Sequence, residues 1–378
     1  MILMALDHIR DMFHRAAMHS SPTDLTKTFP ALFFTRWITH FCAPTFIFLA
    51  GVSAFLWFEG RHTRPQLSRY LLTRGLWLIF LELTVMRFAY TFNFAADNPI
   101  LLIILWVLGA CMVGLAALIY LPRPILLPLS DAVIALHNTL DGINAAHLKH
   151  GAALWRILHQ PGAFVLSGRA VVIGYPLIPW IAVIAAGFCA GPLFQISPVK
   201  RQKILLLTGS SLSLLFLLLR FVNRYGDRFP WTHQPSSMLT LLSFLNTTKY
   251  PPSLLFLMMT LGPALAALAL LERFNFRRAN PLILFGRVPL FYFLVHFYLI
   301  RVLADLFAWS RYGNAARQFF FQPLPSMGGS LKLFPADFGY SLPVVYGVWL
   351  LVLVLLYPLC RWFARIKSDH SSVWLTYL

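Results

Sequence analysis

The sequence predicts an all-α polytopic membrane protein with about ten transmembrane helices. Of its 378 residues, 58% are hydrophobic and only 12% are charged, whereas an average soluble domain has about 25% charged residues. So few polar side chains cannot cover the surface of a soluble chain of this length. In addition, several uncharged stretches are long enough to cross the hydrocarbon core of a bilayer as helices.

The expected spans fall into two groups. Five segments of at least 22 residues contain no Lys, Arg, Asp or Glu; they are 37–58, 99–121, 170–194, 250–271 and 338–360. Four further apolar segments are shorter or carry isolated charges; they are 75–93, 124–137, 204–222 and 281–305. A short apolar stub before Asp7 completes the ten, so we expect the first helix to be truncated and Met1 to lie inside it.

The net charge of +18 is divided among short clusters and does not form one basic face. The densest clusters are 60–74, 197–203, 272–280 and 361–367. Placing them in the cytoplasm agrees with every expected span and puts both termini inside. We therefore expect one domain over 1–378, surrounded by membrane lipids, with extracytoplasmic loops at 138–169 and 306–337 and no nucleic-acid partner. The basic residues serve as topology signals.

The cysteines do not indicate a disulfide framework or a metal site. All four lie in apolar spans and none forms a C-x-x-C pair; they are Cys42, Cys111, Cys189 and Cys360. The sequence also lacks a Walker A loop, a G-x-G-x-x-G fingerprint and an H-E-x-x-H motif. These absences argue against a nucleotide-driven motor, a dinucleotide enzyme and a zinc protease.

The densest polar cluster at membrane depth is LDHIRDMFH, residues 6–14. If the first helix continues through it, Asp7, Asp11 and His14 share one face. A carboxylate beside an imidazole can fix its tautomer and raise its basicity, which suits the removal of a proton from an amine or hydroxyl. The alternative is a helix end whose mixed charges meet lipid headgroups.

Two other spans contain ionisable residues. His40, in WITHFCAPTFIF, lies just inside the outer end of its span, where such groups usually face a cavity. A lone histidine can equally be an interhelical hydrogen-bonding residue. Glu82 and Arg87 are five residues apart and do not share a face, so we expect each to pair with another helix in a structural role.

Three basic side chains are candidates for a phosphate-bearing ligand. Arg74 ends a basic cluster at a cytoplasmic mouth, where it can bind a phosphate bidentately or serve only as a topology anchor. Arg287 and His296 are nine residues apart in GRVPLFYFLVHFYLI. We expect both on one continuous helix, where they form part of a polar path through the membrane.

Several strings resemble the bacterial branch of the heparan-alpha-glucosaminide N-acetyltransferase-like family, and they extend over almost the whole chain. They are LDHIRDMFH, PTDLTKTFPALFFTRWITHFCAPTFIFLAGVSAFLW, LLTRGLWLIFLELT, YPLIPWIAVIAAGFCAG, the segment from Lys249 to Glu272, GRVPLFYFLVHFYL and WLTYL. The resemblance implies a multi-span enzyme of a bacterial inner membrane. Such an enzyme takes acetyl from cytoplasmic acetyl-CoA and delivers it to a sugar amine or hydroxyl on the other side.

The resemblance also implies site residues. The family's catalytic histidine matches His14 most nearly, with His19 as a rival because loop lengths differ. Asp7 matches the polar residue at the end of the first helix, and His40 lies where the lysosomal branch has an acidic residue. Arg74 matches a basic residue that opens the third helix. The family's usual R-G start to helix one is missing, in keeping with a truncated start.

We therefore expect acyl transfer from acetyl-CoA to an unidentified extracytoplasmic glycan, without a metal. His14 is the expected base or transient acyl carrier, oriented by Asp7 or Asp11, and His40 shapes the site or assists proton transfer. Arg74 and Arg287, with His296, are the expected cofactor contacts. A transporter of a small or lipid-linked substrate is the alternative, favoured by an expected helix break in GYPLIPW, residues 174–180. The sequence does not decide whether the protein is a homodimer.

Overall fold

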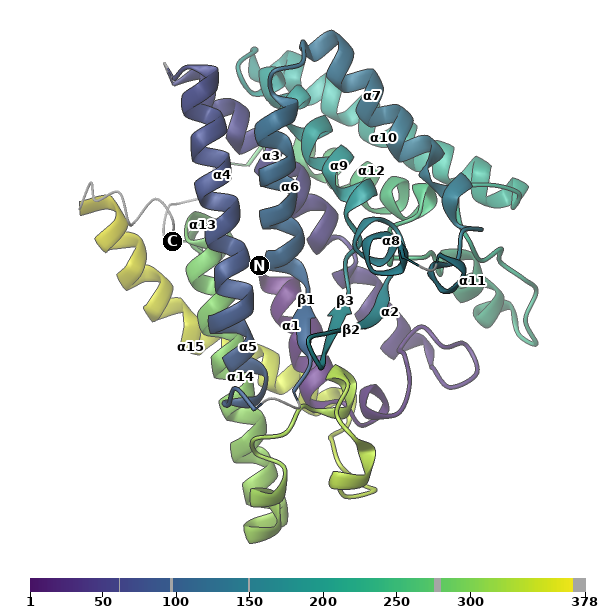
Figure 1. Ribbon diagram of the computed structural model, residues 1–378, viewed down its shortest axis with the longest axis vertical. Coiled ribbons are helices and arrows are strands. Elements are labelled where there is room, and N and C mark those ends of the chain that lie inside the picture. Colours follow the sequence, from purple (N-terminus) through teal and green to yellow (C-terminus); the bar gives the residue numbers. More distant parts are fainter. Residues whose placement is uncertain (61, 96–97, 149, 275–279, 370–378) are drawn as a thin grey trace. The chain divides into compact units, whose positions relative to one another are not determined.

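The structure is a computed structural model that describes residues 1–378 except 61, 96–97, 149, 275–279 and 370–378 (Figure 1). Helices account for most of the described chain, which confirms the helical class expected of a membrane protein. The chain divides into two compact units. Unit 1 comprises Met1–Cys42, Thr84–Asn98 and Phe276–Leu378, and unit 2 comprises Ala43–Leu83 and Pro99–Asn275.

Unit 1 is built around its first helix, α1 (Ile2–Phe13). The apolar side of α1 packs against α2 (Pro30–Thr39), α14 (Pro289–Tyr312) and α15 (Leu342–Asp369). The unit also contains α5 (Arg87–Thr91), α13 (Pro281–Arg287) and short 3₁₀ turns at Arg15–Met18, Gly313–Gln318, Pro325–Met327 and Leu331–Leu333. Burial of Ile9, Met12 and Phe13 on α1 fixes the face of the helix that looks inward and leaves its polar residues on the neighbouring faces.

Unit 2 contains the remaining helices. They are α3 (Cys42–Glu59, apart from its first residue), α4 (Arg64–Leu81), α6 (Ile104–Leu118), α7 (Arg123–Leu136), α8 (Ala152–Leu158), α9 (Leu177–Ala190), α10 (Pro198–Val222), α11 (Ser237–Leu245) and α12 (Leu254–Leu271). A π-helical turn, Glu82–Met86, follows α4, and 3₁₀ turns lie at His137–Leu140, Ala145–His147 and Gly191–Phe194. In Figure 1, α4 lies along α6; α10 and α12 form a second close pair.

Glycines set the close approach of the helices in unit 2. A methyl group added to Gly75 on α4 would lie 2.6 Å from the carbonyl oxygen of Gly109 on α6, and one added to Gly109 would lie 2.5 Å from that of Gly75. Gly209 and Gly262 face each other in the same way. A methyl group on Gly51 would lie 2.0 Å from the carbonyl oxygen of Ile184, and one on Gly187 would lie 2.0 Å from that of Phe48. Small residues that let backbones touch are typical of helix packing inside membranes.

Six helical stretches of the described chain are long and apolar enough to cross a membrane. They are Pro30–Glu59, Leu177–Phe194, Pro198–Val222, Leu254–Leu271, Pro289–Gln318 and Leu342–Asp369. The expected count of about ten is not supported, because α1, α6 and α7 have 12, 15 and 14 residues. At 1.5 Å per residue they are shorter than a core of roughly 30 Å. The first turns of α4 contain three arginines.

A small sheet departs from the expected all-α fold. Strands β1 (Ile100–Leu102), β3 (Arg169–Ile173) and β2 (Gly162–Leu166) lie in that order, with β1 parallel to β3 and β2 antiparallel to it. Ser167 and Gly168 form the hairpin turn, both with positive φ. The signal was present as a Ser-Gly pair between two short apolar runs, but 138–169 was expected to be a loop and 170–194 a single span.

Several expected boundaries were wrong for identifiable reasons. α4 begins at Arg64, capped by Thr63 with Gln66 in a capping box, so most of the first basic cluster is helical. α14 extends to Tyr312, inside the expected loop 306–337. Pro176 and Pro179 lie at the cap and in the first turn of α9, where proline is tolerated, so GYPLIPW is a helix start and not a break. Part of the basic cluster 272–280, and the closing WLTYL, lie outside the described residues.

Two buried arginines stabilise irregular segments of the chain. Most of their hydrogen bonds go to backbone carbonyls and not to acidic side chains. Arg220 on α10 donates to the carbonyl oxygens of Phe244, Ser243, Phe229 and Asn246. Arg301 on α14 donates to those of Tyr90, Phe320 and Gln322 and pairs with Asp305. Since an unsatisfied backbone carbonyl is costly in a membrane, both side chains have a structural role.

Candidate functional site

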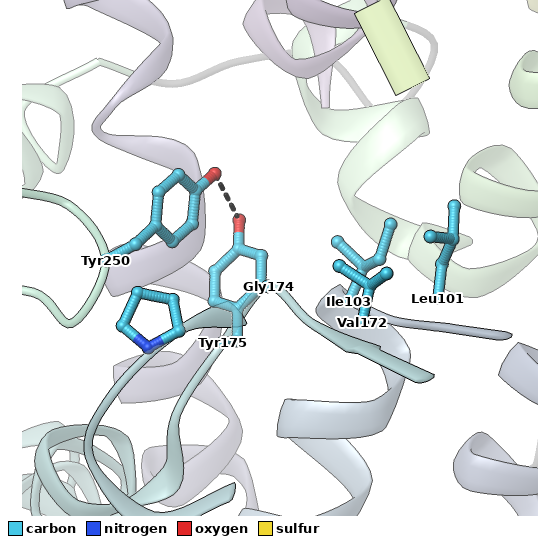
Figure 2. A pocket seen from close by; sticks show the side chains of 7 residues that line it. Leu101, Ile103, Val172, Gly174, Tyr175 and Tyr250 are labelled. Atoms are coloured by element: carbon cyan, nitrogen blue, oxygen red, sulfur yellow. Dashed lines mark hydrogen bonds between the residues drawn. The ribbon is translucent and has the colours of Figure 1, made fainter. Parts of the chain in front are cut away.

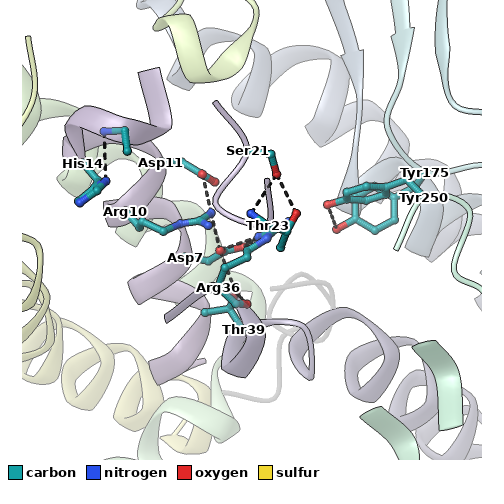
Figure 3. A network of polar contacts seen from close by, with 11 residues as sticks. Asp7, Arg10, Asp11, His14, Ser21, Thr23, Arg36, Thr39, Tyr175 and Tyr250 are labelled. Carbon is teal, nitrogen blue, oxygen red and sulfur yellow. Dashed lines mark hydrogen bonds and ion pairs between the residues drawn. The ribbon is translucent and has the colours of Figure 1, made fainter. Parts of the chain in front are cut away.

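The polar residues of α1 form an ion-pair network with α2 inside unit 1 (Figure 3). The Nη2 atom of Arg10 lies 2.8 Å from Oδ1 of Asp7 and 2.6 Å from Oδ1 of Asp11. Arg36 of α2 donates to both carboxylate oxygens of Asp7, at 2.6 and 2.5 Å, and Thr39 donates to Oδ1 at 2.8 Å. Two aspartates and two arginines therefore balance in charge where α1 meets α2.

The network brings together residues that the sequence analysis treated differently. Asp7 and Asp11 were expected to orient His14, but the structure binds their carboxylates to guanidinium groups. The sequence did not single out Arg10, Arg36 or Thr39 as site residues. A usable signal for Arg10 was its position three residues after Asp7 on a helix that is otherwise apolar; Arg36 lies 29 residues from Asp7 and offers no such local spacing.

Arg10 is the most deeply buried member of the network. Its side chain is 1% exposed, and its Nε and Nη1 atoms have no hydrogen-bond partner among the residues that the structure describes. A buried guanidinium with unused donors is costly. Such an arrangement is typical of a site that gains a hydrogen-bond acceptor when a ligand binds.

The end of α1 determines where His14 lies. Helical geometry stops at Phe13, and His14 has extended backbone angles, φ −77° and ψ 127°. The cause is a backbone bridge to Tyr340. The N–H of Tyr340 donates to the carbonyl of Phe13, and the N–H of Arg15 donates to the carbonyl of Tyr340. Gly339 makes this bridge possible, because a methyl group there would lie 2.7 Å from the Cα of Arg15. The expectation that His14 continues the helical face of Asp7 and Asp11 was wrong.

His14 is nevertheless held beside the network in a buried position. The residue is 5% exposed, and its Nδ1 accepts a hydrogen bond of 3.2 Å from the N–H of Ala16. A neutral ring with this bond carries its proton on Nε2. Burial, with the positive charges of Arg10 and Arg15, lowers the pKa of His14 from its ordinary value of 6.5, so the ring is neutral at physiological pH.

The rival histidine has a different environment. His14 and His19 flank the same 3₁₀ turn, Arg15–Met18. The side chain of His19 is exposed. A proton-transfer residue needs a positioned side chain, and His14 is the member of this pair that is buried and held by a hydrogen bond.

His40 lies at the carboxyl end of α2, next to Thr39 of the network, and is 3% exposed. The structure therefore places it close in the chain to a residue that binds Asp7. The helical stretch Pro30–Glu59 contains the expected span 37–58, and its α-helix is interrupted here, because α2 ends at Thr39 and α3 begins at Cys42. His40 thus occupies a junction between helices, where an irregular backbone lets a polar side chain remain buried.

A second buried polar cluster lies on α14. His296 is 0% exposed, with Nδ1 near the carbonyls of Tyr292 and Phe293 and its ring 5.3 Å from that of His8. The Nε2 of His296 and the hydroxyl of Tyr292 have no partner among the described residues. His296 and Arg287 are not on one helix, since α13 ends at Arg287 and α14 begins at Pro289. The expected polar path along a single helix was therefore wrong.

The remaining candidates are placed individually. Arg74 of unit 2 is half-buried and donates to the hydroxyl of Tyr70 at 3.1 Å. Arg287 of unit 1 is exposed at the end of α13. Glu82 is buried, and its carboxylate accepts hydrogen bonds from the N–H groups of Leu105 and Trp106 at the start of α6. A carboxylate at a helix N-terminus is stabilising, in agreement with its expected structural role.

The structure offers little for metal binding. None of the four cysteines, all of which are described, forms a disulfide. Among the described residues, no group of three or more His, Cys, Asp or Glu side chains is arranged to hold a metal ion.

Comparison with known proteins gives one match, to a protein family, and this match covers most of the chain. A family model described as "Heparan-alpha-glucosaminide N-acetyltransferase, catalytic" matches residues 1–235. No curated protein and no solved structure matches the sequence. The matched residues include α1, His14, α2 and the whole Asp7–Arg36 network.

Proposed function

Because the chain belongs to the heparan-alpha-glucosaminide N-acetyltransferase family, we propose that it is a membrane enzyme that transfers acetyl from acetyl-CoA to an amine or hydroxyl of a sugar. The family match over residues 1–235 is the observation that carries this proposal. The partly buried network of Asp7, Arg10, Asp11 and Arg36, next to a neutral histidine, supports it. The proposed direction is from the cytoplasm to the outside.

The proposed chemistry needs one base. A nitrogen of His14 takes the proton from the acceptor N–H or O–H, and the acceptor atom attacks the thioester carbonyl carbon. The C–S bond then breaks, and the CoA thiolate takes the proton from the imidazolium. For this the ring must exchange its bond to the N–H of Ala16, which at 3.2 Å is at the long end of the hydrogen-bond range. Direct attack by the same nitrogen on acetyl-CoA would instead form an acetyl-histidine.

The charged network has a positioning and electrostatic role in this proposal. Next to the two aspartates, the Nε and Nη1 donors of Arg10 have no acceptor among the described residues. Donors fixed in a water-poor site stabilise negative charge that develops on an oxygen during acyl transfer. Asp7 and Asp11 hold the guanidinium in place and offset its charge, and His40 shapes the same part of unit 1.

For the CoA phosphates we propose Arg74 and Arg287, each within its own unit, because an arginine can bind a phosphate through two hydrogen bonds. We leave His296 out of this set because its ring is completely buried. A bacterial inner membrane, with both termini cytoplasmic, is the proposed location. The main feature that favoured a transporter, a helix break at Pro176 and Pro179, is a helix start.

Acetyl-CoA is expected to bind the purified full chain more tightly than free CoA does. Isothermal titration in detergent measures both affinities. Arg74→Ala should weaken acetyl-CoA binding by about 10- to 100-fold, the effect of losing a hydrogen bond to a charged group. Arg69→Ala on the same helix is the matched control, since Arg69 is exposed, and should bind as the unchanged protein does. Failure of both ligands to bind would reject the proposed donor.

The rate of transfer is expected to fall on the acid side of pH 6.5. His14 is active as a base only when neutral, and its pKa is lowered from 6.5 by burial and by Arg10 and Arg15. The acid limb of kcat/KM should therefore have its midpoint below 6.5. Arg15→Ala removes one of these charges and should move the midpoint upward, whereas Arg15→Lys should leave it in place. A midpoint above 6.5, or one indifferent to Arg15, would contradict the assignment.

A further inference from the structure

Unit 2 contains a pocket whose lining residues are not among those of the proposed acetyl-transfer site. It has a volume of about 320 Å³, within the range of pockets that hold small ligands. Its walls come from the small sheet, from the segment that follows β3 and from the segment before α12; the lining residues are Leu101, Ile103, Pro161, Val172, Gly174, Tyr175 and Tyr250. In Figure 2 the two tyrosines lie across from Leu101, Ile103 and Val172.

The pocket presents an apolar interior. Four of the lining side chains are aliphatic or proline, and the two tyrosines contribute their rings, perpendicular to each other with centroids 5.0 Å apart. The only hydroxyls in the lining belong to Tyr175 and Tyr250, and these bond to each other at 3.4 Å. Because those polar groups are already paired, the pocket favours an aliphatic chain over a hydrogen-bonding ligand.

A cation lies behind the aromatic wall. The ammonium nitrogen of Lys249 is 5.1 Å from the ring centroid of Tyr250 and 5.9 Å from that of Tyr175. Lys249 is 9% exposed and has no ion-pair partner among the residues that the structure describes. Asp227, the carboxylate bound to residues on either side of Lys249, accepts hydrogen bonds from Thr248 and Ser253 at 2.7–2.8 Å.

A buried ammonium group without a counter-ion is costly, and cation–π contacts offset only part of that cost. An anion bound there would remove the imbalance. The same ligand must also fill the adjacent apolar pocket. An aliphatic chain that ends in an anionic headgroup satisfies both requirements at once.

We propose that this pocket binds an anionic lipid, with the part of the chain nearest the headgroup between β3 and the two tyrosines, and the headgroup paired with Lys249. The proposal concerns binding alone and does not depend on acetyl transfer. The chemistry selects a long-chain phosphate or carboxylate, and a free inorganic anion would leave the apolar walls unfilled.

The test uses the full chain in phosphatidylcholine nanodiscs and a photoactivatable alkyl phosphate, with the alcohol of the same chain length as the neutral probe. Peptide mapping by mass spectrometry should locate the label around residues 101–103, 172–175 and 249–250. The phosphate probe should label these peptides at least about tenfold more than the alcohol. Acetyl-CoA is absent, so the result is independent of the proposed enzyme activity.

Matched variants separate the pocket from general membrane contact. Val172→Trp fills the pocket and should abolish the label, whereas Val165→Trp on neighbouring β2, where the residue is 73% exposed, should not. Lys249→Met should remove the preference for phosphate over alcohol, while Lys332→Met at an exposed position should retain it. Equal labelling by both probes, label spread over other peptides, or complete competition by inorganic phosphate would overturn the proposal.

Discussion

Replacing His14 by alanine is expected to lower the rate of acetyl transfer by about 10²- to 10⁴-fold, the usual effect of losing a general acid or base. The physical reason is its position: His14 is buried at the end of α1, next to the Asp7–Arg36 network, and its pKa is lowered by burial and by two arginines. Transfer can be measured as thiol release from acetyl-CoA with a simple glucosaminide as acceptor.

His14 also has a structural contact that must be separated from its proposed chemical role. Its Nδ1 caps the 3₁₀ turn Arg15–Met18 by accepting from the N–H of Ala16. His14→Asn keeps a side-chain acceptor suited to a cap but removes the base, so it should be as inactive as His14→Ala while remaining folded. His19→Ala should retain most activity. Normal transfer by His14→Asn would show that capping is the only role of His14.

The sequence singled out Asp7 and Asp11 because their spacing is a local signal. Asp7 and Asp11 are one helical turn apart, and the structure keeps both within reach of one guanidinium nitrogen of Arg10. Long apolar stretches likewise predicted the helical membrane class, and six of them have the length of a span. Such patterns depend only on neighbours within a few residues.

The parts that could not be predicted depend on contacts distant in sequence. α1 ends at Phe13 because Tyr340, over 300 residues away, bonds to the backbone on either side of His14. The pairing of Asp7 with Arg36 crosses a loop. β1 is a strand because β3 lies beside it, with Leu101 opposite Val172. In each case the partner is fixed by tertiary packing, and the local pattern permits more than one outcome.

The largest effect on stability is expected from Asp7→Ala. Asp7 accepts hydrogen bonds from Arg36, Arg10 and Thr39, and its side chain is 13% exposed. Its removal takes away the carboxylate that both Arg10 and Arg36 contact. Removing one partner of a buried ion pair costs about 3–5 kcal/mol. The midpoint of thermal unfolding in detergent should therefore fall, and Arg36→Met on the Asp7→Ala background should restore part of the loss, since the double variant no longer buries that charge.

Asp24 provides the matched control for this experiment. Its carboxylate bonds only locally, to the N–H and hydroxyl of Thr26, on the exposed segment between α1 and α2, so Asp24→Ala should leave the unfolding midpoint almost unchanged. Asp7→Asn distinguishes two roles for the carboxylate. If this variant unfolds like the unchanged protein but transfers no acetyl, Asp7 acts on the reaction and the ion pairs are not what stabilises unit 1. If stability and activity fall together, the charge of Asp7 acts by holding Arg10 and Arg36 in place, and any effect on His14 is transmitted through that network.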